Sequence, residues 1–133
     1  MSPTIFIVDD DEAVRDSLKL LLETYGMKVE QYGSTAEFKQ HYRPRGCECL
    51  LLDQHLPGAT GLDFLSSAEG SKEHPPVILM TGRSDSALQD RAAQLGAFAY
   101  LEKPIGDRVL MAAIHRALSS TQRCDEAGPW TIY

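Results

Sequence analysis

The sequence predicts an α/β domain with one parallel five-stranded sheet and helices on both faces of that sheet. The first observation behind this class is the alternation of short apolar runs with amphipathic segments, which repeats five times along the 133 residues. The second is that four of the five apolar runs end in residues able to bind or react, as expected where parallel strands present their carboxyl ends to a ligand. Right-handed crossovers through the helices would keep the strands parallel.

The first part of the chain supplies two strands and two helices. Residues 4–8 are a continuous apolar strand, and residues 12–25 carry apolar side chains at helical spacing on one face. Residues 28–32 are a short, partly polar run, which favours a strand near an edge of the sheet. Ser34 and Glu37 form a capping box that predicts the start of the next helix.

The second part continues the alternation with three strands and three helices. Residues 47–52 are almost entirely apolar and end at Asp53, after which a loop with proline and glycine leads to a helix over residues 62–68. The remaining elements are a strand over residues 77–80, a helix over 85–95, a strand over 97–101 and a helix over 107–118. Functional residues are therefore expected at the carboxyl edge of the sheet.

Three consecutive carboxylates follow the first strand, where Asp9, Asp10 and Asp11 fall in one turn. A nucleotide-binding unit would place glycines there, so that backbone N–H groups could approach a phosphate. Clustered carboxylate oxygens instead suit a hard divalent ion such as Mg²⁺. Helix capping is the alternative explanation for Asp11 and Glu12, while Asp9 and Asp10 together favour the metal.

The ends of four strands together predict a single site. The side chains concerned are those of Asp9, Asp10, Asp53, Thr81 and Lys103. Carboxylates this close would repel and raise one another's pKa values, unless a divalent ion and an ammonium group compensated them. Each residue alone would suit a structural role, such as a helix cap or a solvated charge, so it is the combination that indicates chemistry.

Composition limits the partners of the chain. Its formal net charge of -6 and its pI of about 5.1 argue against direct binding to nucleic acid, which needs clustered lysine and arginine. No apolar run approaches the ~20 residues of a membrane span, and no export signal is visible at the N-terminus. A single cytoplasmic domain is the expectation.

Over residues 4–118 the sequence resembles the receiver domain of two-component response regulators. The resemblance rests on four segments, which are VDDDEAVRDSL, LLDQHLPGATGLDFL, ILMTGRSD and AYLEKP. Receiver domains have a flavodoxin-like (βα)5 fold with the strand order 2-1-3-4-5. The resemblance therefore implies the same order of strands here.

The resemblance also implies that Asp53 accepts a phosphoryl group from a phosphohistidine on a sensor histidine kinase. The ligands of Mg²⁺, for which Mn²⁺ can substitute, would be Asp10, Asp53, the backbone carbonyl of His55 and, through water, Asp9. A receiver domain is not an enzyme acting on a separate substrate. It catalyses only its own phosphotransfer and a slow autodephosphorylation.

Further residues match the switch of the family. Lys103 would pair with a phosphoryl oxygen, and its bond to the following proline resembles a cis peptide of the family. Thr81 matches the hydroxyl that moves to meet the phosphoryl group, and Tyr100 matches the aromatic switch behind it. His55 occupies a position that influences the hydrolysis rate in receivers, so a catalytic role for its side chain is an alternative to a role through its backbone.

The resemblance further implies that the surface that changes on phosphorylation is formed by residues 85–95, 97–101 and 107–118. This surface would control dimerisation or contact with a partner or output domain. The last of these helices is apolar nearly all round from Val109 to Ile114, which suits an interface. Tolerated exposure of small side chains is the alternative.

Residues 1–119 are the expected receiver domain, and residues 120–133 are a polar C-terminal tail or a truncated linker. The chain is then either a free-standing receiver or a fragment of a transcriptional regulator. Two other classes fit the residues less well. A phosphatase of the haloacid dehalogenase type also uses an Asp nucleophile with Mg²⁺, but its second Asp would stand where His55 is. A pseudo-receiver that only binds partners would lack an acidic ligand, the acceptor or the lysine, and the sequence has all of them.

Overall fold

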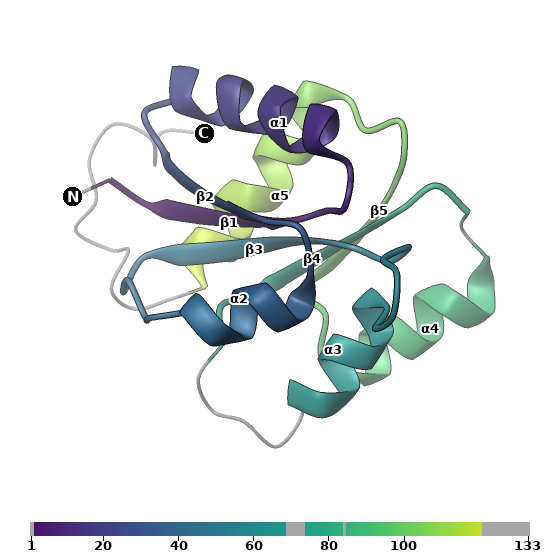
Figure 1. The fold of residues 1–133 in the computed structure, drawn as a ribbon. Helices are drawn as coiled ribbons and strands as arrows, with labels where there is room; N and C mark the ends of the chain where they lie inside the picture. Colours follow the sequence, from purple (N-terminus) through teal and green to yellow (C-terminus); the bar gives the residue numbers. More distant parts are fainter. Residues whose placement is uncertain (1, 69–73, 84, 121–133) are drawn as a thin grey trace.

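Five parallel strands form one sheet in the order β2-β1-β3-β4-β5 (Figure 1). The strands are β1 (Thr4–Val8), β2 (Lys28–Tyr32), β3 (Glu48–Asp53), β4 (Val77–Thr81) and β5 (Ala99–Glu102). The structure is a computed structural model and describes residues 2–68, 74–83 and 85–120. The flavodoxin-like order predicted from the resemblance is confirmed, and it places the topological switch point of the sheet between β1 and β3.

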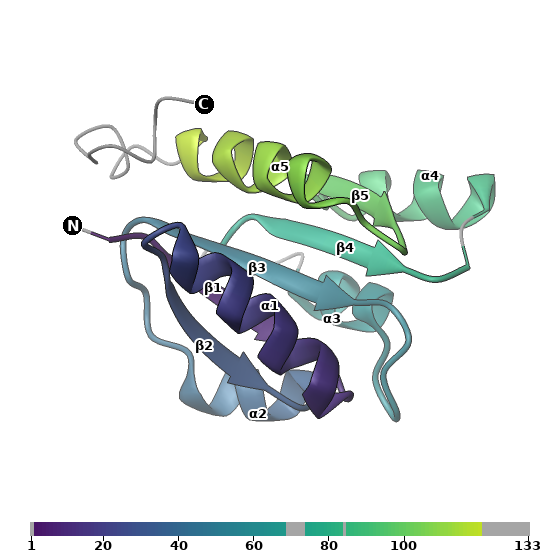
Figure 2. The same cartoon turned by 90° about the horizontal axis from the view of Figure 1, so that it is seen from above.

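The helices form two layers, one on each face of the sheet (Figures 1 and 2). The first layer consists of α1 (Glu12–Thr24) and α5 (Asp107–Ser119). The second consists of α2 (Thr35–His41), α3 (Gly61–Ala68) and α4 (Ser86–Gln94). The three central strands are therefore covered on both faces, which explains why they are buried along their whole length.

The side chains of the central strands alternate between two hydrophobic cores. On β1, Ile5 and Ile7 belong to the core shared with α1 and α5, whereas Phe6 and Val8 belong to the core under α2, α3 and α4. The strands β2 and β5 lie at the edges of the sheet, where most of their residues are only half buried. The prediction that residues 28–32 form an edge strand is confirmed.

Three strands, β3, β4 and β5, extend one residue further than their apolar runs indicate. Asp53 ends β3 and is paired with Met80, and Thr81 ends β4 and is paired with Glu102. The hydropathy pattern stops at the first polar residue, whereas backbone pairing between neighbouring strands continues through it. The backbones of Asp53 and Thr81 are therefore held by the sheet.

Polar side chains cap two helices near their predicted starts. Ser34 accepts a hydrogen bond from the N–H of Glu37, and Glu37 Oε1 accepts one from Gly33, the residue before the cap. Asp85 likewise accepts from the N–H of Leu88 at 2.7 Å. These bonds satisfy N–H groups that the first turn of a helix leaves without partners, and so explain where α2 and α4 begin.

Most of the apolar run in α5 packs on the sheet. Leu110, Met111, Ala113 and Ile114 are buried, whereas Val109 is 55% exposed. The buried side chains join the core that α5 shares with α1, as helical spacing allows. The run therefore supplies less exposed apolar surface for an interface than the sequence indicated.

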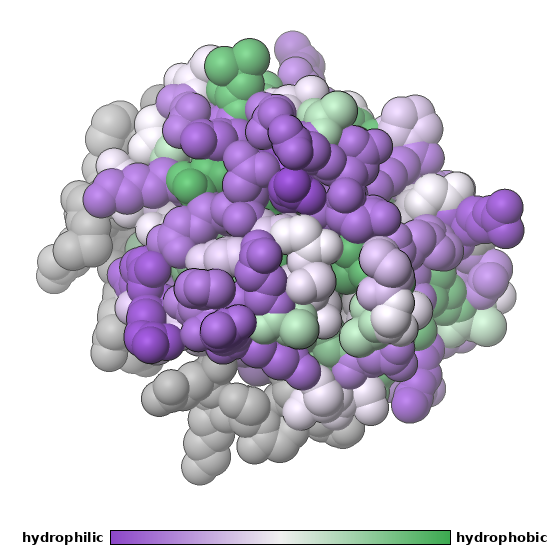
Figure 3. All heavy atoms as spheres, viewed as in Figure 1, coloured by the Kyte–Doolittle hydropathy of each residue, from purple (hydrophilic) through white to green (hydrophobic). Residues whose placement is uncertain are grey.

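Hydrophilic side chains dominate the face of the molecule in Figure 3, where hydrophobic side chains show only in separate spots. The exposed large apolar residues of the described ranges lie on different segments and are Leu20, Tyr25, Phe98 and Val109. Within those ranges, no helix is both long enough and apolar enough to cross a lipid bilayer.

Candidate functional site

The carboxyl ends of β1 and β3 bring three carboxylates together. Asp9 and Asp10 follow β1 and Asp53 ends β3, and each offers one ligand oxygen within 4.8 Å of the others. Asp9 and Asp53 are buried, whereas Asp10 is exposed. One side of this acidic cluster is thus enclosed by protein, and the other is open to solvent.

Lys103, which follows β5, places its ammonium group between two of these carboxylates. Its Nζ lies 3.3 Å from Asp53 Oδ1 and 3.4 Å from Asp9 Oδ2. The backbone N–H of Lys103 donates to the carbonyl of Thr81 at 2.7 Å, so the lysine is tied to the end of β4. The peptide bond between Lys103 and Pro104 is cis, as the resemblance implied.

The charges of the site are strongly coupled. Burial raises the pKa of Asp53 and repulsion from Asp9 adds to this rise, while Lys103 opposes it without cancelling it. Burial would lower the pKa of Lys103, but the carboxylates of Asp53 and Asp9 together outweigh burial and raise that pKa. The lysine therefore stays charged at neutral pH, and further positive charge at the acidic cluster would stabilise the ionised form of Asp53.

The third residue of the acidic run has a different role. Asp11 caps α1, because its Oδ1 accepts from the N–H groups of Ala13 and Val14 at 2.9 and 3.4 Å. The N–H of Asp11 in turn donates to Asp9 Oδ1 at 2.9 Å, which orients the Asp9 carboxylate toward the site. Capping therefore accounts for Asp11 and leaves Asp9 and Asp10 for the cluster.

Arg15 holds the loop after β1 in place. Its Nη1 donates to the backbone carbonyl of Asp9 at 2.7 Å, and its Nε donates to Oε1 of Gln31 at 3.0 Å. The loop that carries the acidic pair is thus bonded to α1, and α1 to β2. Sequence reasoning missed Arg15, because its helical position does not distinguish it from a solvated surface cation. Its place shortly after an acidic run was the signal that could have found it.

The turn after β3 depends on a close approach at Gly61. A Cβ atom there would lie 2.5 Å from Cδ1 of Leu79, 3.0 Å from the backbone oxygen of Asp53 and 3.1 Å from Cα of Gln54. A side chain at this position would crowd both Leu79 and the backbone at the end of β3, so glycine allows α3 to begin this close to β3. Gln54 supports the same turn, because its Oε1 accepts from the N–H of Leu62 at 2.9 Å.

The predicted switch residues Thr81 and Tyr100 lie on neighbouring strands, β4 and β5. Thr81 is fully buried, and its Oγ1 lies 3.0 Å from Nε2 of His55 and within hydrogen-bond distance of Arg83. The sequence predicted a role for the backbone of His55, with a catalytic role of its ring as the alternative, and the contact of the ring with Thr81 is a finding of the structure. Tyr100 is half buried and packs against the core under α2, α3 and α4.

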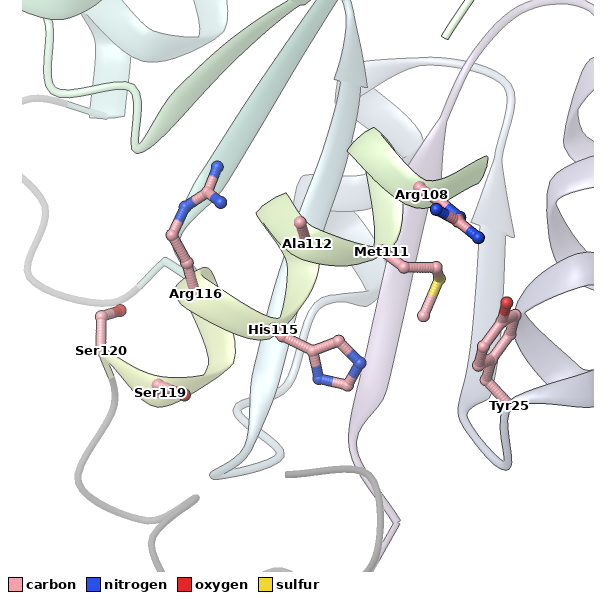
Figure 4. Close-up of a pocket in the computed structure, with 8 residues that line it drawn as sticks. All are labelled: Tyr25, Arg108, Met111, Ala112, His115, Arg116, Ser119 and Ser120. Carbon is pink, nitrogen blue, oxygen red and sulfur yellow. The ribbon is translucent and has the colours of Figure 1, made fainter. Parts of the chain in front are cut away.

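One surface hollow adjoins the site and another does not. The first, of about 460 Å³, lies between α1 and the loop before α5, where Lys103 stands among apolar side chains such as Leu18 and Ile105. The second, of about 700 Å³, lies along α5, and Figure 4 shows His115 pointing from α5 toward Tyr25. No residue of the acidic cluster lines the second hollow, so it is separate from the site.

The fold is that of a flavodoxin-like domain with an acidic cluster at the carboxyl edge of its sheet, and comparison of sequences identifies the family. The family model of the response regulator receiver domain matches residues 5–115. The transcriptional regulatory protein FixJ of Azorhizobium caulinodans is 40% identical over 114 residues, which cover 86% of this chain and 54% of FixJ. Nodulation protein W of Bradyrhizobium diazoefficiens is 36% identical over 123 residues, which cover 92% of this chain and 54% of that protein. The chain belongs to the response regulator receiver domains of two-component systems, and it spans about half the length of these curated relatives.

Solved structures resemble the chain over most of its length. The crystal structure of FixJ-N has a TM-score of 0.77 and 32% identity, and the match covers 90% of this chain and 95% of that one. The response regulator StyR has a TM-score of 0.83 and 33% identity, covering 91% of this chain and 61% of StyR. The chemotaxis protein CheY4 of Vibrio cholerae shares the fold, with a TM-score of 0.74 and 21% identity. The match covers 89% of this chain and all of CheY4.

Proposed function

We propose that Asp53 accepts a phosphoryl group from the phosphohistidine of a sensor histidine kinase. The observation that carries this proposal is the position of Asp53 Oδ1, which lies 3.3 Å from Lys103 Nζ and within the acidic cluster. A buried carboxylate next to an ammonium group is a nucleophile whose charge is held in a defined place. Membership of the receiver family supports the choice of phosphohistidine as the donor.

The donor set of the site suits Mg²⁺, for which Mn²⁺ can substitute, because the three side chains offer hard oxygen atoms. The proposed ligands are Asp10, Asp53, the backbone carbonyl of His55 and, through water, Asp9. When bound, the ion neutralises negative charge that develops on the phosphoryl group. The raised pKa of Asp53 supports a cation here, since the acidic cluster gains from further positive charge.

The transfer is an in-line displacement in which the residues of the chain supply position and charge. An oxygen of Asp53 forms a bond to phosphorus while the phosphorus–nitrogen bond of the phosphohistidine breaks, and the electron pair leaves on the imidazole nitrogen. Both hydrogen bonds that described residues make to the Asp53 carboxylate fall on Oδ1, from Lys103 Nζ and from the N–H of His55. Oδ2 is therefore the proposed attacking oxygen, and Lys103 pairs with a phosphoryl oxygen afterwards.

The proposed consequence of phosphorylation is a switch of the face formed by α4, β5 and α5. Thr81 turns toward the phosphoryl group and Tyr100 follows it, because the added charge and acceptor oxygens favour the arrangement that contacts them. The face then controls dimerisation or contact with a partner or output domain. A receiver domain of NtrC4 activated by beryllofluoride is described as a dimer, which supports the first of these outcomes.

The proposed receiver unit is residues 1–119, followed by a tail or linker over residues 120–133, of which 121–133 lie outside the described residues. A match that covers 61% of full-length FixJ from B. japonicum supports a place within a longer transcriptional regulator. The chain would act in the cytoplasm and, with its formal charge of -6, without touching nucleic acid directly. It would catalyse only its own phosphotransfer and a slow autodephosphorylation.

Phosphorylation by acetyl phosphate with Mg²⁺, followed by intact-mass spectrometry, tests the acceptor. The unchanged chain should gain one phosphoryl group, and Asp53→Asn should gain none. Asp63→Asn, which alters an exposed aspartate in α3, is the matched control and should be modified like the unchanged chain. An adduct that persists in Asp53→Asn would refute the assignment.

A further inference from the structure

The hydroxyl of Thr81 uses its whole hydrogen-bonding capacity in this structure. Its oxygen donates to the carbonyl of Arg83 at 3.2 Å and accepts from the N–H of Arg83 at 3.1 Å. The third contact, at 3.0 Å, is with Nε2 of His55. A hydroxyl has one hydrogen to donate and two lone pairs that accept, so these three bonds saturate it.

The single hydrogen of the Thr81 hydroxyl is engaged whichever tautomer the ring of His55 adopts. Thr81 Oγ1 donates to the carbonyl of Arg83 when Nε2 of His55 carries hydrogen, and it donates to Nε2 when that nitrogen carries none. Thr81 is fully buried whereas His55 is exposed, so the ring lies on the solvent side of the hydroxyl. In this arrangement Thr81 has no hydrogen left to offer to a phosphoryl oxygen.

His55 also contacts the acceptor residue. Its backbone N–H donates to Asp53 Oδ1 at 3.4 Å, while its ring reaches Thr81 across 26 positions of the sequence. One residue is thus bonded to the end of β3 through its main chain and to the end of β4 through its side chain. His55 therefore links the turn after β3 to the end of β4.

We propose that the side chain of His55 is a positioning residue that holds Thr81 in its unswitched arrangement and so sets how readily the domain switches. This inference rests on the proposed function of Asp53. To donate to a phosphoryl oxygen, the Thr81 hydroxyl must give up its bond to Arg83 and turn away from the ring of His55. The bond from His55 therefore stabilises the unswitched state, and its loss shifts the equilibrium toward the switched state.

The test is the affinity of the full chain for beryllofluoride in the presence of Mg²⁺, because this phosphoryl mimic binds the switched state. His55→Leu removes the ring nitrogen that bonds to Thr81 and keeps the backbone carbonyl. It should bind the mimic about two to ten times more tightly, which is the factor that one hydrogen bond of ordinary net strength contributes. His55→Gln retains an amide that both donates and accepts at a similar reach, and it should return the affinity toward that of the unchanged chain.

A double-mutant cycle separates the bond from other effects of changing residue 55. In a Thr81→Val background, which lacks the hydroxyl, His55→Leu should leave the affinity for beryllofluoride unchanged. The backbone amide resonance of Arg83, measured by NMR with Mg²⁺ and without the mimic, should move in His55→Leu toward its position in the saturated unchanged chain. A merely structural role for His55 would produce neither result.

Two outcomes would overturn the inference about His55 and leave the proposed function of Asp53 intact. One is an affinity of His55→Leu equal to that of the unchanged chain, and the other is a weaker affinity that His55→Gln restores. Failure of the unchanged chain to bind beryllofluoride would have a different meaning. It would overturn the proposed function of Asp53 and, with it, the switch on which His55 is proposed to act.

Discussion

Lys103 Nζ lies 3.3 Å from Asp53 Oδ1, although the two residues stand 50 positions apart in the sequence. They meet because Lys103 follows β5 and Asp53 ends β3, on either side of β4. The side chain of Asp53 is only 6% exposed and that of Lys103 is 32% exposed, so the ammonium group faces the buried carboxylate from the solvent side. This ion pair affects both the charge of the resting carboxylate and the proposed transfer to it.

Replacing Lys103 by methionine should raise the pKa of Asp53 further and slow its phosphorylation. The ammonium group now lowers that pKa against burial and Asp9, and the phosphoryl group would lose its cationic partner as well. We expect the rate of phosphorylation by acetyl phosphate to fall ~100-fold, as when one donor to a developing negative charge is removed. Lys103→Arg keeps the charge on a different shape and should give an intermediate rate. An undiminished rate in Lys103→Met would argue against the role of the ammonium group.

Asp53→Asn should make the domain more stable at pH 7 in the absence of divalent ions. The pKa of Asp53 is raised in the folded chain, mainly by burial, so the folded state holds this proton more tightly than the unfolded state. The stability that Asp53 contributes is therefore fully present below its unfolded pKa of about 3.9 and is lost as the pH rises through the folded pKa. Neutral asparagine does not suffer that loss.

Thermal unfolding of the two proteins across pH measures this difference. The gap in Tm should be largest near neutral pH and should shrink as the pH approaches about 4, where Asp53 becomes protonated in both states. Added Mg²⁺ should also narrow the gap, because the ion stabilises the native chain that binds it. If Asp53→Asn were the less stable protein at pH 7 without metal, the carboxylate would not be disfavoured by its surroundings.

Asp10→Ala and Asp11→Ala should affect different properties, although the residues are neighbours. Asp10 is the exposed member of the acidic cluster, so its loss should weaken Mg²⁺ binding by about tenfold or more and leave stability nearly unchanged. Asp11 caps α1, so its loss should cost ~1 kcal/mol of unfolding free energy. Calorimetric titration with Mg²⁺ and denaturant unfolding measure the two effects. The reverse pattern would assign Asp11 to the metal and Asp10 to the helix.

Gly61→Ala should destabilise the domain by about 1–3 kcal/mol, because the added methyl group overpacks the turn after β3. The new atom would meet Leu79 at 2.5 Å and the backbone of Asp53 at 3.0 Å, so the proposed acceptor should be displaced as well. Gly82→Ala is the matched control, since a Cβ atom there meets nothing within 4 Å. Both the unfolding free energy, measured with denaturant, and the rate of phosphorylation should be lower in Gly61→Ala than in the control. Equal stability would mean that α3 can shift away from β3 without cost.

Local patterns were sufficient to predict the elements of the fold. Strands and helices follow from periodicity among residues close in the chain, and so did the edge position of β2. The same patterns placed Asp53 at the end of one strand and Lys103 after another, which brought both to the carboxyl edge of a parallel sheet. The order of the strands needed the family resemblance, because periodicity does not state which strands pair.

Other features came from contacts between distant segments. The neighbours Asp10 and Asp11 look equivalent in the sequence, and they differ because α1 begins directly after Asp11 while the end of β3 lies beside Asp10. The contact of His55 with Thr81 and that of Arg15 with Asp9 join loops to other elements. The residues of these pairs stand 26 and 6 positions apart, and neither spacing follows from the periodicity of a helix or a strand.

The apolar run of α5 shows what a hydropathy pattern alone does not predict. Its composition allowed either an interface or tolerated exposure of small side chains, whereas packing against the sheet in fact buries Leu110 and Ile114 and leaves Val109 at the surface. A hydropathy pattern states which residues prefer burial and at what period. Which side chains meet is decided by the register of the strands and by close backbone contacts such as the one at Gly61. Register and backbone contacts depend on the packing of all the elements at once, so a hydropathy pattern does not contain them.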